Sequence, residues 1–200
     1  MTAKPPEWFE IFSSGARQYG QGYSTIFIFL TVAFLDGKRR REIARLVLGF
    51  LMAALAVNVL KVLTGRERPG YSLESGRMWH LLTGVFDTGW HSFPSAHATS
   101  AFALSAALAV MYRRGRMVFY LAAVFCGLTR IMDLQHWVSD VIAGGALGVW
   151  IGSGAFRWRW LGRVADAIAG LFAPRTAAPE GPCAPRRQDN DDSVGPAVVA

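Results

Sequence analysis

Long apolar runs alternate with short basic or glycine-rich interruptions along most of the chain. A membrane-spanning helix needs about 20 predominantly apolar residues. The first run is the shortest, and it reaches bilayer length only if the weakly polar residues before it are included. The pattern predicts an all-α integral membrane helical bundle of five spans. The five runs lie at residues 23–35, 43–63, 94–112, 117–132 and 136–156.

The segments that flank these runs are more polar. Residues 7–20 mix apolar and polar positions as in an amphipathic helix that lies in the membrane interface, and the bundle has six spans if this segment is counted. From residue 173 onward Pro, Ala, Gly and acidic residues dominate, a composition that buries too little apolar surface to fold. We therefore expect an interfacial segment (1–22), a transmembrane domain (23–160) and a cytoplasmic tail (161–200), disordered from about 173.

Glycines recur every four residues in the last apolar run, at Gly144, Gly148 and Gly152. On a helix this spacing places all three on one face, where the missing side chains allow a neighbouring helix to approach closely. The stripe therefore predicts a packing surface inside the bundle.

The composition agrees with a membrane protein, since 52% of the residues are hydrophobic and the mean hydropathy is +0.26. The formal charge of +7 and the pI near 10.0 also suit a nucleic-acid-binding protein. However, the basic residues form short clusters between apolar runs and do not line one soluble face. We therefore expect no nucleic-acid partner and no obligatory protein partner.

The basic clusters also predict an orientation. Residues 38–41, 113–116 and 157–163 fall on one side of the membrane if the five spans are placed as above, and loops rich in Lys and Arg are usually cytoplasmic. The loop at 64–91 and the turn at 133–135 then face away from the cytoplasm. This topology suits a bacterial inner membrane protein with its functional groups on the periplasmic side or cell exterior.

Ionisable residues at the extracytoplasmic ends of the spans are candidates for chemistry, because charge within a bilayer is costly and rarely kept without a function. Lysine and arginine there supply positive charge, two histidines can titrate near neutral pH, and one aspartate supplies a carboxylate. The predicted topology brings all of them to the same membrane face. They are Lys61, Arg68, His97, Arg130, His136 and Asp140.

Each of these groups also has an ordinary structural interpretation. Lys61 alone resembles a side chain that extends from a span end to the interface. Pro94 suits the first turn of a helix whose free N–H groups can bind an anion, but the same segment can be a simple helix start. His136 and Asp140 lie four residues apart, so on one helix the carboxylate can fix the imidazole tautomer, or the two can be only a satisfied polar pair.

Taken together, the segments at 61–69, 94–97 and 129–140 resemble the type 2 phosphatidic acid phosphatase superfamily, which shares its fold with vanadium haloperoxidases. The signature of that family is K-x6-RP, then PSGH, then SR-x5-H-x3-D. Its charged and titrating positions all occur here in order and spacing. Two positions depart: Ala96 replaces a glycine but keeps its N–H, and Thr129 replaces a serine but keeps the hydroxyl.

The resemblance implies a metal-independent lipid phosphatase without cofactors that forms a phosphohistidine intermediate. His136 would be the nucleophile, Asp140 would orient it, and His97 would protonate the leaving oxygen and later activate water. Cations can stabilise the equatorial oxygens of a transferring phosphoryl group. The implied phosphate-binding groups are Lys61, Arg68, Ser95, the N–H groups near Ala96, and Arg130.

Other interpretations differ in their expected chemistry. A zinc site from His80, His91, His97 and His136 is conceivable, but no close ligand spacing such as HExxH supports it. An anionic-lipid transporter or binding protein would use the cations but would not need both histidines and Asp140. A lipid phosphotransferase would share the intermediate and differ only in its acceptor.

The substrate is left open by the sequence. Phosphatidic acid, phosphatidylglycerol phosphate, undecaprenyl diphosphate and a lipid A phosphate all present phosphate at the outer leaflet. Loop residues can contact the substrate or one another, or form only an interfacial belt. These residues are Arg66, Glu67, Arg77, Trp79, His80 and Trp90.

Overall fold

The computed structural model describes residues 6–70, 78–79, 81–82 and 88–171. Helices dominate this part of the chain, and its only strand-like feature is an isolated bridge between Arg66 and Trp79. The predicted all-α class is therefore confirmed. The helices are α1 (Glu7–Gln18), α2 (Gly22–Leu35), α3 (Arg40–Thr64), α5 (Ala96–Met111), α6 (Arg116–Met132), α7 (Val138–Arg157) and α8 (Arg159–Leu171).

Three helical segments are long and apolar enough to cross a membrane: Gly37–Thr64, Arg113–Met132 and Val138–Arg157. They contain α3, α6 and α7. Helices α2 and α5 are apolar but have only 14 and 16 residues, fewer than the roughly 20 that a full crossing requires. The chain is thus a membrane protein, and the crossing of α2 and α5 stays a prediction.

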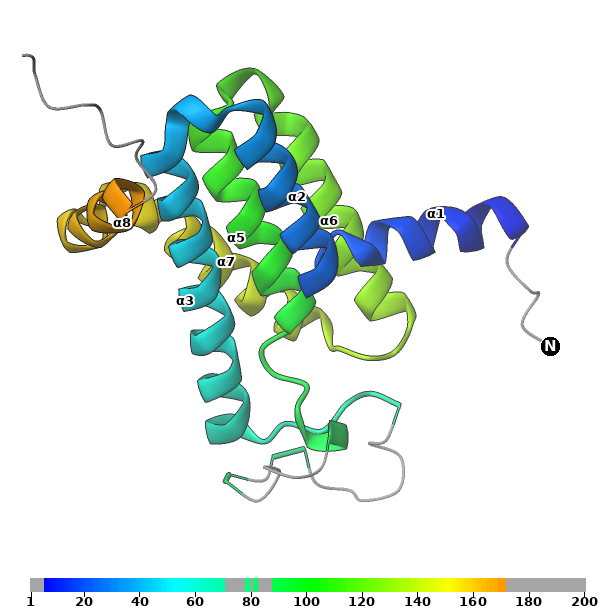
Figure 1. Ribbon diagram of the computed structural model, residues 1–200. Helices are drawn as coiled ribbons and strands as arrows, with labels where there is room; N and C mark the ends of the chain where they lie inside the picture. The colour runs from blue at the N-terminus through cyan, green and yellow to red at the C-terminus, as the bar shows by residue number, and fades with distance from the viewer. Residues whose placement is uncertain (1–5, 71–77, 80, 83–87, 172–200) are drawn as a thin grey trace, which may run out of the picture.

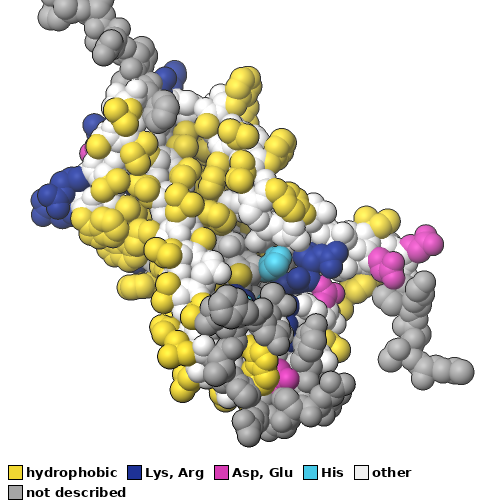
Figure 2. Space-filling view, turned by 60° about the horizontal axis from the view of Figure 1, so that its bottom comes forward, with side chains coloured by type: hydrophobic (Ala, Val, Ile, Leu, Met, Phe, Trp, Pro, Cys, Tyr) yellow, Lys and Arg dark blue, Asp and Glu magenta, His cyan; other side chains and the backbone are white. Residues whose placement is uncertain are grey.

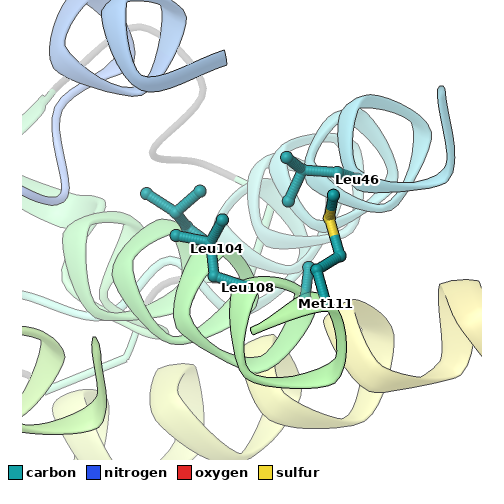
Figure 3. Packing of buried hydrophobic residues seen from close by; sticks show 5 residues of the cluster. Leu46, Leu104, Leu108 and Met111 are labelled. Atoms are coloured by element: carbon teal, nitrogen blue, oxygen red, sulfur yellow. The ribbon is translucent and has the colours of Figure 1, made fainter. Parts of the chain in front are cut away.

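Helix α5 lies at the centre of the bundle and packs against α3, α6 and α7 (Figure 1). Its sequence is rich in alanine, so neighbouring helices can approach it from several sides while its backbone stays helical. Larger side chains fill the space between α3 and the C-terminal half of α5. These buried residues include Leu46, Leu104, Leu108 and Met111 (Figure 3).

The glycine stripe of α7 forms the contact with α5, as predicted. A Cβ atom added to Gly144, Gly148 or Gly152 would collide with a main-chain oxygen of α5 or its cap, and all three glycines are buried. The oxygens belong to Ser95, Thr99 and Ala103. This close packing fixes α7 against the start of α5, where the predicted site segment 94–97 meets the end of the segment 129–140.

The basic clusters lie together at one end of the bundle. Arg39 donates to the carbonyl oxygen of Met111 over 3.0 Å, which joins the α2–α3 and α5–α6 connections. Arg41 pairs with Asp166 of α8 at 3.2 Å. Residues 65–70 and 88–95, which lie between α3 and α5, and the turn from α6 to α7 lie at the opposite end (Figure 1). The bundle therefore separates its basic connections from its candidate site, as the sequence predicts.

Two amphipathic helices flank the bundle. Helix α1 projects sideways from it (Figure 1) and packs on α6 through an edge-to-face contact between Phe12 and Phe125, with ring centroids 5.2 Å apart. Helix α8 packs on α3 and buries Leu161 and Ala165. The interfacial position of α1 and the proposed domain limits stay predictions, and the tail from residue 172 lies outside the described residues.

Candidate active site

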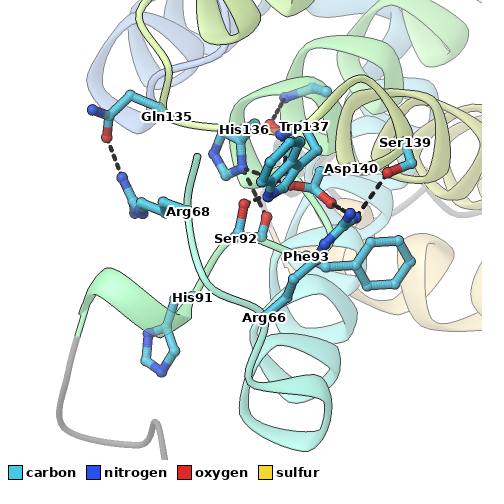
Figure 4. A network of polar contacts seen from close by, with 12 residues as sticks. Arg66, Arg68, His91, Ser92, Phe93, Gln135, His136, Trp137, Ser139 and Asp140 are labelled. Carbon is cyan, nitrogen blue, oxygen red and sulfur yellow. Dashed lines mark hydrogen bonds and ion pairs between the residues drawn. The ribbon is translucent and has the colours of Figure 1, made fainter. Parts of the chain in front are cut away.

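The site lies where the segment after α3 passes beneath the turn between α6 and α7 (Figure 4). Gly65 ends α3 in the left-handed conformation, with φ 51°, which a glycine adopts without steric cost. Residues 66–70 then run between the segments 88–92 and 134–137. Main-chain hydrogen bonds fix this path, including Ser92 N to Arg66 O (2.9 Å) and Gly70 N to Leu134 O (3.3 Å).

The carboxylate of Asp140 accepts hydrogen bonds from three donors. Asp140 is fully buried in the first turn of α7, and its carboxylate accepts a hydrogen bond from the main-chain N–H of Trp137 (2.9 Å), which caps the helix. It also accepts from the Ser92 hydroxyl and from Arg66, each over 2.5 Å. A buried carboxylate with three donors is held ionised and in a single orientation.

Arg66 is therefore a partner of Asp140, a pairing that the sequence did not predict. Its guanidinium also donates to the Ser139 hydroxyl (2.7 Å) and lies over the rings of Trp79 and Trp137, at 4.9 and 5.5 Å from the centroids. These contacts bury Arg66 and direct it at the carboxylate, not at solvent. The only available signal was the general rule that a buried charge needs a partner.

His136 lies two residues before α7, so the prediction that it shares a helix with Asp140 was wrong. Trp137 is the N-cap residue, and the turn before it holds the imidazole. Its Nδ1 lies 2.7 Å from the main-chain oxygen of Ser92 and 3.8 Å from the nearer Asp140 oxygen. A carbonyl oxygen can only accept, so Nδ1 carries the proton and Nε2 keeps a free lone pair.

The surroundings of His136 favour its neutral form. Burial lowers the pKa of His136 below its ordinary value, and the positive charges of Lys61 and Arg68 lower it further, although the nearby Asp140 carboxylate and the hydrogen bond to Ser92 oppose this. The side chain is buried. At neutral pH the imidazole therefore has the protonation state that a nitrogen nucleophile requires.

The three predicted cations come from α3, the following loop and α6. Lys61 is buried and donates to the main-chain oxygen of His91 over 2.5 Å. Arg68 hydrogen bonds to the side chain of Gln135. Arg130 pairs with Asp133, which Arg17 of α1 also contacts at 3.5 Å. These bonds hold the three cations around the turn that carries His136.

His97 is the second residue of α5 and belongs to the same electrostatic cluster. The fold thus brings together the charged and titrating residues that the sequence analysis identified in three separate segments. The charges and imidazole that act on His97 belong to Arg130, His136, Lys61 and Arg17.

Ser95 caps the start of α5. Its hydroxyl accepts from the N–H of Ala98 (3.4 Å) and its own N–H donates to the main-chain oxygen of Asp140 (3.0 Å). Pro94 therefore precedes the cap, and its predicted place in the first helical turn was wrong. Ala96 begins the helix with ordinary helical geometry, so no glycine is needed there.

Leu134, in the turn between α6 and α7, has a φ of 53° although it is not glycine. Its side chain is 61% exposed. A left-handed leucine costs about 1–2 kcal/mol, so the turn that presents Gln135 and His136 is held in a strained conformation.

The zinc alternative gains no support from the residues that the structure describes. No group of three or more His, Cys, Asp or Glu side chains among them could hold a metal ion. The ring of His91 points away from His136 (Figure 4). His80 and Arg77 lie outside the described residues, and a headgroup-contacting role for Trp79 or Trp90 stays a prediction.

The surface around the site combines charge with apolar area. Figure 2 shows a histidine beside basic side chains and an acidic one, below a broad hydrophobic surface. Such a surface can present both a polar headgroup and an apolar chain with suitable contacts.

Comparison with known proteins places this arrangement in a family. Lipid A 1-phosphatase from Rhizobium johnstonii is 38% identical over 100 residues, covering 50% of this chain and 41% of the relative. The Rhizobium etli protein of the same name is also 38% identical over 100 residues, covering 50% and 43%. The chain therefore matches less than half the length of these relatives.

A solved structure extends the likeness to the fold. The crystal structure of Aquifex aeolicus LpxE matches with a TM-score of 0.63 at 25% identity, covering 78% of this chain and 89% of that chain. The sequence model of the PAP2 superfamily matches residues 42–163, more than half of the chain and all three site segments. The chain therefore belongs to the PAP2 superfamily, the family that its motifs resemble.

Proposed function

We propose that this chain is an integral membrane phosphatase that hydrolyses a lipid-linked phosphomonoester or diphosphate through a phosphohistidine at His136. The hydrogen bond from His136 Nδ1 to the Ser92 carbonyl oxygen carries the proposal. It commits the imidazole to the tautomer in which Nε2 can attack phosphorus. The neighbouring cations supply the positive charge that phosphoryl transfer requires.

The reaction has two steps in this proposal. In the first, Nε2 of His136 forms a bond to phosphorus, the bond to the lipid oxygen breaks, and His97 gives its proton to that oxygen. In the second, His97 takes a proton from water, the water oxygen bonds to phosphorus, and the N–P bond breaks. A bound phosphate favours the protonated His97 that the first step needs, because opposite charge stabilises an imidazolium.

Lys61, Arg68 and Arg130 would hold the phosphate oxygens. Nε of Arg130 is buried and has no hydrogen-bond partner within the described part of the chain, and a buried donor of this kind is a candidate to bind an anion. The first N–H groups of α5, near Ala96, also lack intrahelical acceptors. Ser95 contributes by capping this helix, and Asp140 orients the site through Ser92.

We propose a lipid A phosphate as the first substrate to test, because two relatives carry the name lipid A 1-phosphatase. Phosphatidic acid, phosphatidylglycerol phosphate and undecaprenyl diphosphate complete the panel. Phosphate release from these lipids in detergent should persist in excess EDTA and should be blocked by vanadate, which mimics five-coordinate phosphorus. Loss of activity on chelation, with recovery on adding zinc, would overturn the metal-independent mechanism.

Product analysis separates hydrolysis from transfer. A hydrolase releases inorganic phosphate in the absence of any second lipid, whereas a phosphotransferase makes a new phosphorylated lipid when an acceptor is supplied. We expect phosphate release without an acceptor. A transporter or binding protein would bind the lipid without releasing phosphate in either assay.

We also propose that the site faces the periplasm of a bacterial inner membrane, since the basic connections lie at the other end of the bundle. In a Cys183→Ser background, Leu134→Cys should react with a membrane-impermeant maleimide in intact cells. Arg114→Cys should react only after the membrane is opened. The reverse pattern would place the site in the cytoplasm.

A further inference from the structure

An apolar groove of about 380 Å³ lies between α6 and α7, outside the polar site. Ligand pockets in proteins typically range from about 300 to 1,000 Å³. Phe102 of α5 lies against Gly145 of α7, whose added Cβ would come within 3.2 Å of the ring. The groove is lined by Phe102, Val124, Leu128, Ile131, Val138, Val141, Ile142, Gly145, Ala146 and Val149.

The groove reaches the end of the bundle that carries the proposed phosphate site. Ile131 follows Arg130 directly, and Val138 lies two residues after His136. Both residues lie at the end of their helices that carries the site. A ligand whose phosphate lies between Arg130 and His136 is therefore close in sequence to one end of this groove.

The groove has the dimensions of one membrane leaflet. From Val138 to Val149 the helical rise amounts to about 16 Å, and half of a typical hydrocarbon core is about 15 Å. The helices on both sides, α6 and α7, are among those apolar and long enough to cross a membrane. An acyl chain that starts at the site can thus follow the groove to about the middle of the bilayer.

We propose that this groove binds an acyl chain of the lipid whose phosphate the site hydrolyses. The proposal rests on the function proposed above and adds where the apolar part of the substrate lies. The lining is apolar throughout, so it offers a chain dispersion contacts and nothing to hydrogen bond. The occupant is a substrate chain because the groove extends, through Ile131 and Val138, to the end of α6 and α7 that carries the site.

Filling the groove tests the proposal. Ala146 is exposed on α7 within the groove, so Ala146→Trp adds bulk without entering the core. Ala33→Trp is the matched control: Ala33 is likewise exposed, but it lines a groove of about 510 Å³ at the basic end, between α2, α3 and α8. Each variant should be assayed with a long-chain lipid monophosphate in mixed micelles and with p-nitrophenyl phosphate, which has no chain.

We expect Ala146→Trp to lower kcat/KM for the lipid roughly tenfold or more, mainly through KM, since apolar contacts that are lost supply binding energy. The activity of this variant on p-nitrophenyl phosphate should change less than about twofold. The control Ala33→Trp should have wild-type activity on both substrates. Equal lipid activity in Ala146→Trp and wild type would overturn the groove assignment alone. A wild-type enzyme that hydrolyses neither substrate would instead overturn the proposed function.

Photo-crosslinking decides the case in which Ala146→Trp loses both activities. A lipid monophosphate with a diazirine in its acyl chain should crosslink to α6 and α7 at groove residues such as Leu128 and Ile142. The reaction needs binding but no turnover, so it can also be done with His136→Ala. Crosslinks confined to the groove at the basic end would overturn the proposal.

Discussion

The two ends of the bundle both contain ion pairs between arginine and aspartate, and they differ in burial. At the site end Arg66 pairs with Asp140 at 2.5 Å, with side chains 10% and 0% exposed. At the other end Arg41 pairs with Asp166 at 3.2 Å, with side chains 71% and 43% exposed. These two pairs have the same chemistry, but Arg66–Asp140 is sealed in protein and Arg41–Asp166 is open to the surroundings.

This difference indicates what each end is for. A buried pair is costly to form and is kept where orientation matters, whereas exposed pairs contribute little stability. At the site end, charged side chains such as Arg66 fix Asp140 and the loop around His136. Under the proposed topology, the positive charges of the basic end would orient the chain in the membrane. Substitutions at the two ends should therefore differ in kind and in size.

The largest difference should appear with His136→Ala. If His136 is the nucleophile, as proposed, its removal abolishes the covalent intermediate, so lipid phosphatase activity should fall by roughly 10⁴-fold or more. Arg41→Ala at the basic end should leave activity within about twofold. Steady-state assays of purified variants in detergent measure both. If His136→Ala retained a trapped acid-labile phosphate, the assignment of the nucleophile would be wrong.

His97→Ala should have a smaller effect that depends on the leaving group. Loss of a general acid typically costs roughly 10²- to 10⁴-fold. An aryl phosphate departs without protonation, so this variant should still release a burst of aryl alcohol and then turn over slowly. Rapid mixing with p-nitrophenyl phosphate would show the burst. A variant with neither burst nor turnover would mean that His97 serves binding or nucleophile placement instead.

Stability should distinguish the two ion pairs directly. Arg66→Ala leaves the Asp140 charge buried without its partner, which should cost about 3–5 kcal/mol. Arg41→Ala removes an exposed partner and should cost about 0–1 kcal/mol. Tryptophan fluorescence during denaturation in detergent can follow both. Similar small losses would show that water or another cation reaches Asp140 when Arg66 is absent.

The pH profile tests the electrostatics of the site end. Because the pKa of His136 is lowered, its neutral and nucleophilic form persists below pH 6.5, the ordinary value. The acidic limb of kcat/KM should therefore lie below pH 6.5. Arg68→Gln removes a nearby positive charge, so it should move this limb to higher pH, and Arg41→Gln should not move it. A shift in the opposite direction for Arg68→Gln would contradict the assignment of this limb to His136.

The smallest expected effect concerns the strained turn at the site end. Leu134→Gly removes the steric cost of a positive φ but gives the unfolded chain more freedom, so the net gain should be about 1 kcal/mol or less. Thermal unfolding in detergent would detect a modest rise in Tm. A fall in Tm would mean that contacts of the leucine side chain outweigh its backbone strain.

The sequence predicted most helices to within a few residues because long apolar runs and their basic interruptions mark helix ends directly. It also placed Lys61, His97 and His136 at one end, since a bundle with alternating spans brings every second connection together. Helix α2 covers the whole predicted run 23–35, whereas α5 is shorter than the predicted run 94–112 because Pro94 and Ser95 precede it and Tyr112 follows it.

The sequence did not predict the hydrogen-bond partners of Asp140 that come from the loop between α3 and α5. The Arg66–Asp140 pair and the role of Ser92 depend on the path of the segment after α3, which has no periodic pattern to define its course. His136 was expected on α7 because helical spacing explains its distance from Asp140 in sequence. Trp137 as N-cap places it in the preceding turn instead. Tertiary contacts set this boundary, and the local pattern does not contain them.

The acceptor that fixes the His136 tautomer is a main-chain oxygen, that of Ser92. All amino acids have the same main-chain carbonyl group, whatever their side chain. No substitution at position 92 therefore removes the acceptor. A mutational survey would assign any sensitivity at Ser92 to its hydroxyl, which binds Asp140, and would miss the main-chain contact with His136. Because substitutions at position 92 leave this acceptor in place, evolution can change the contact only by changing the path of the loop.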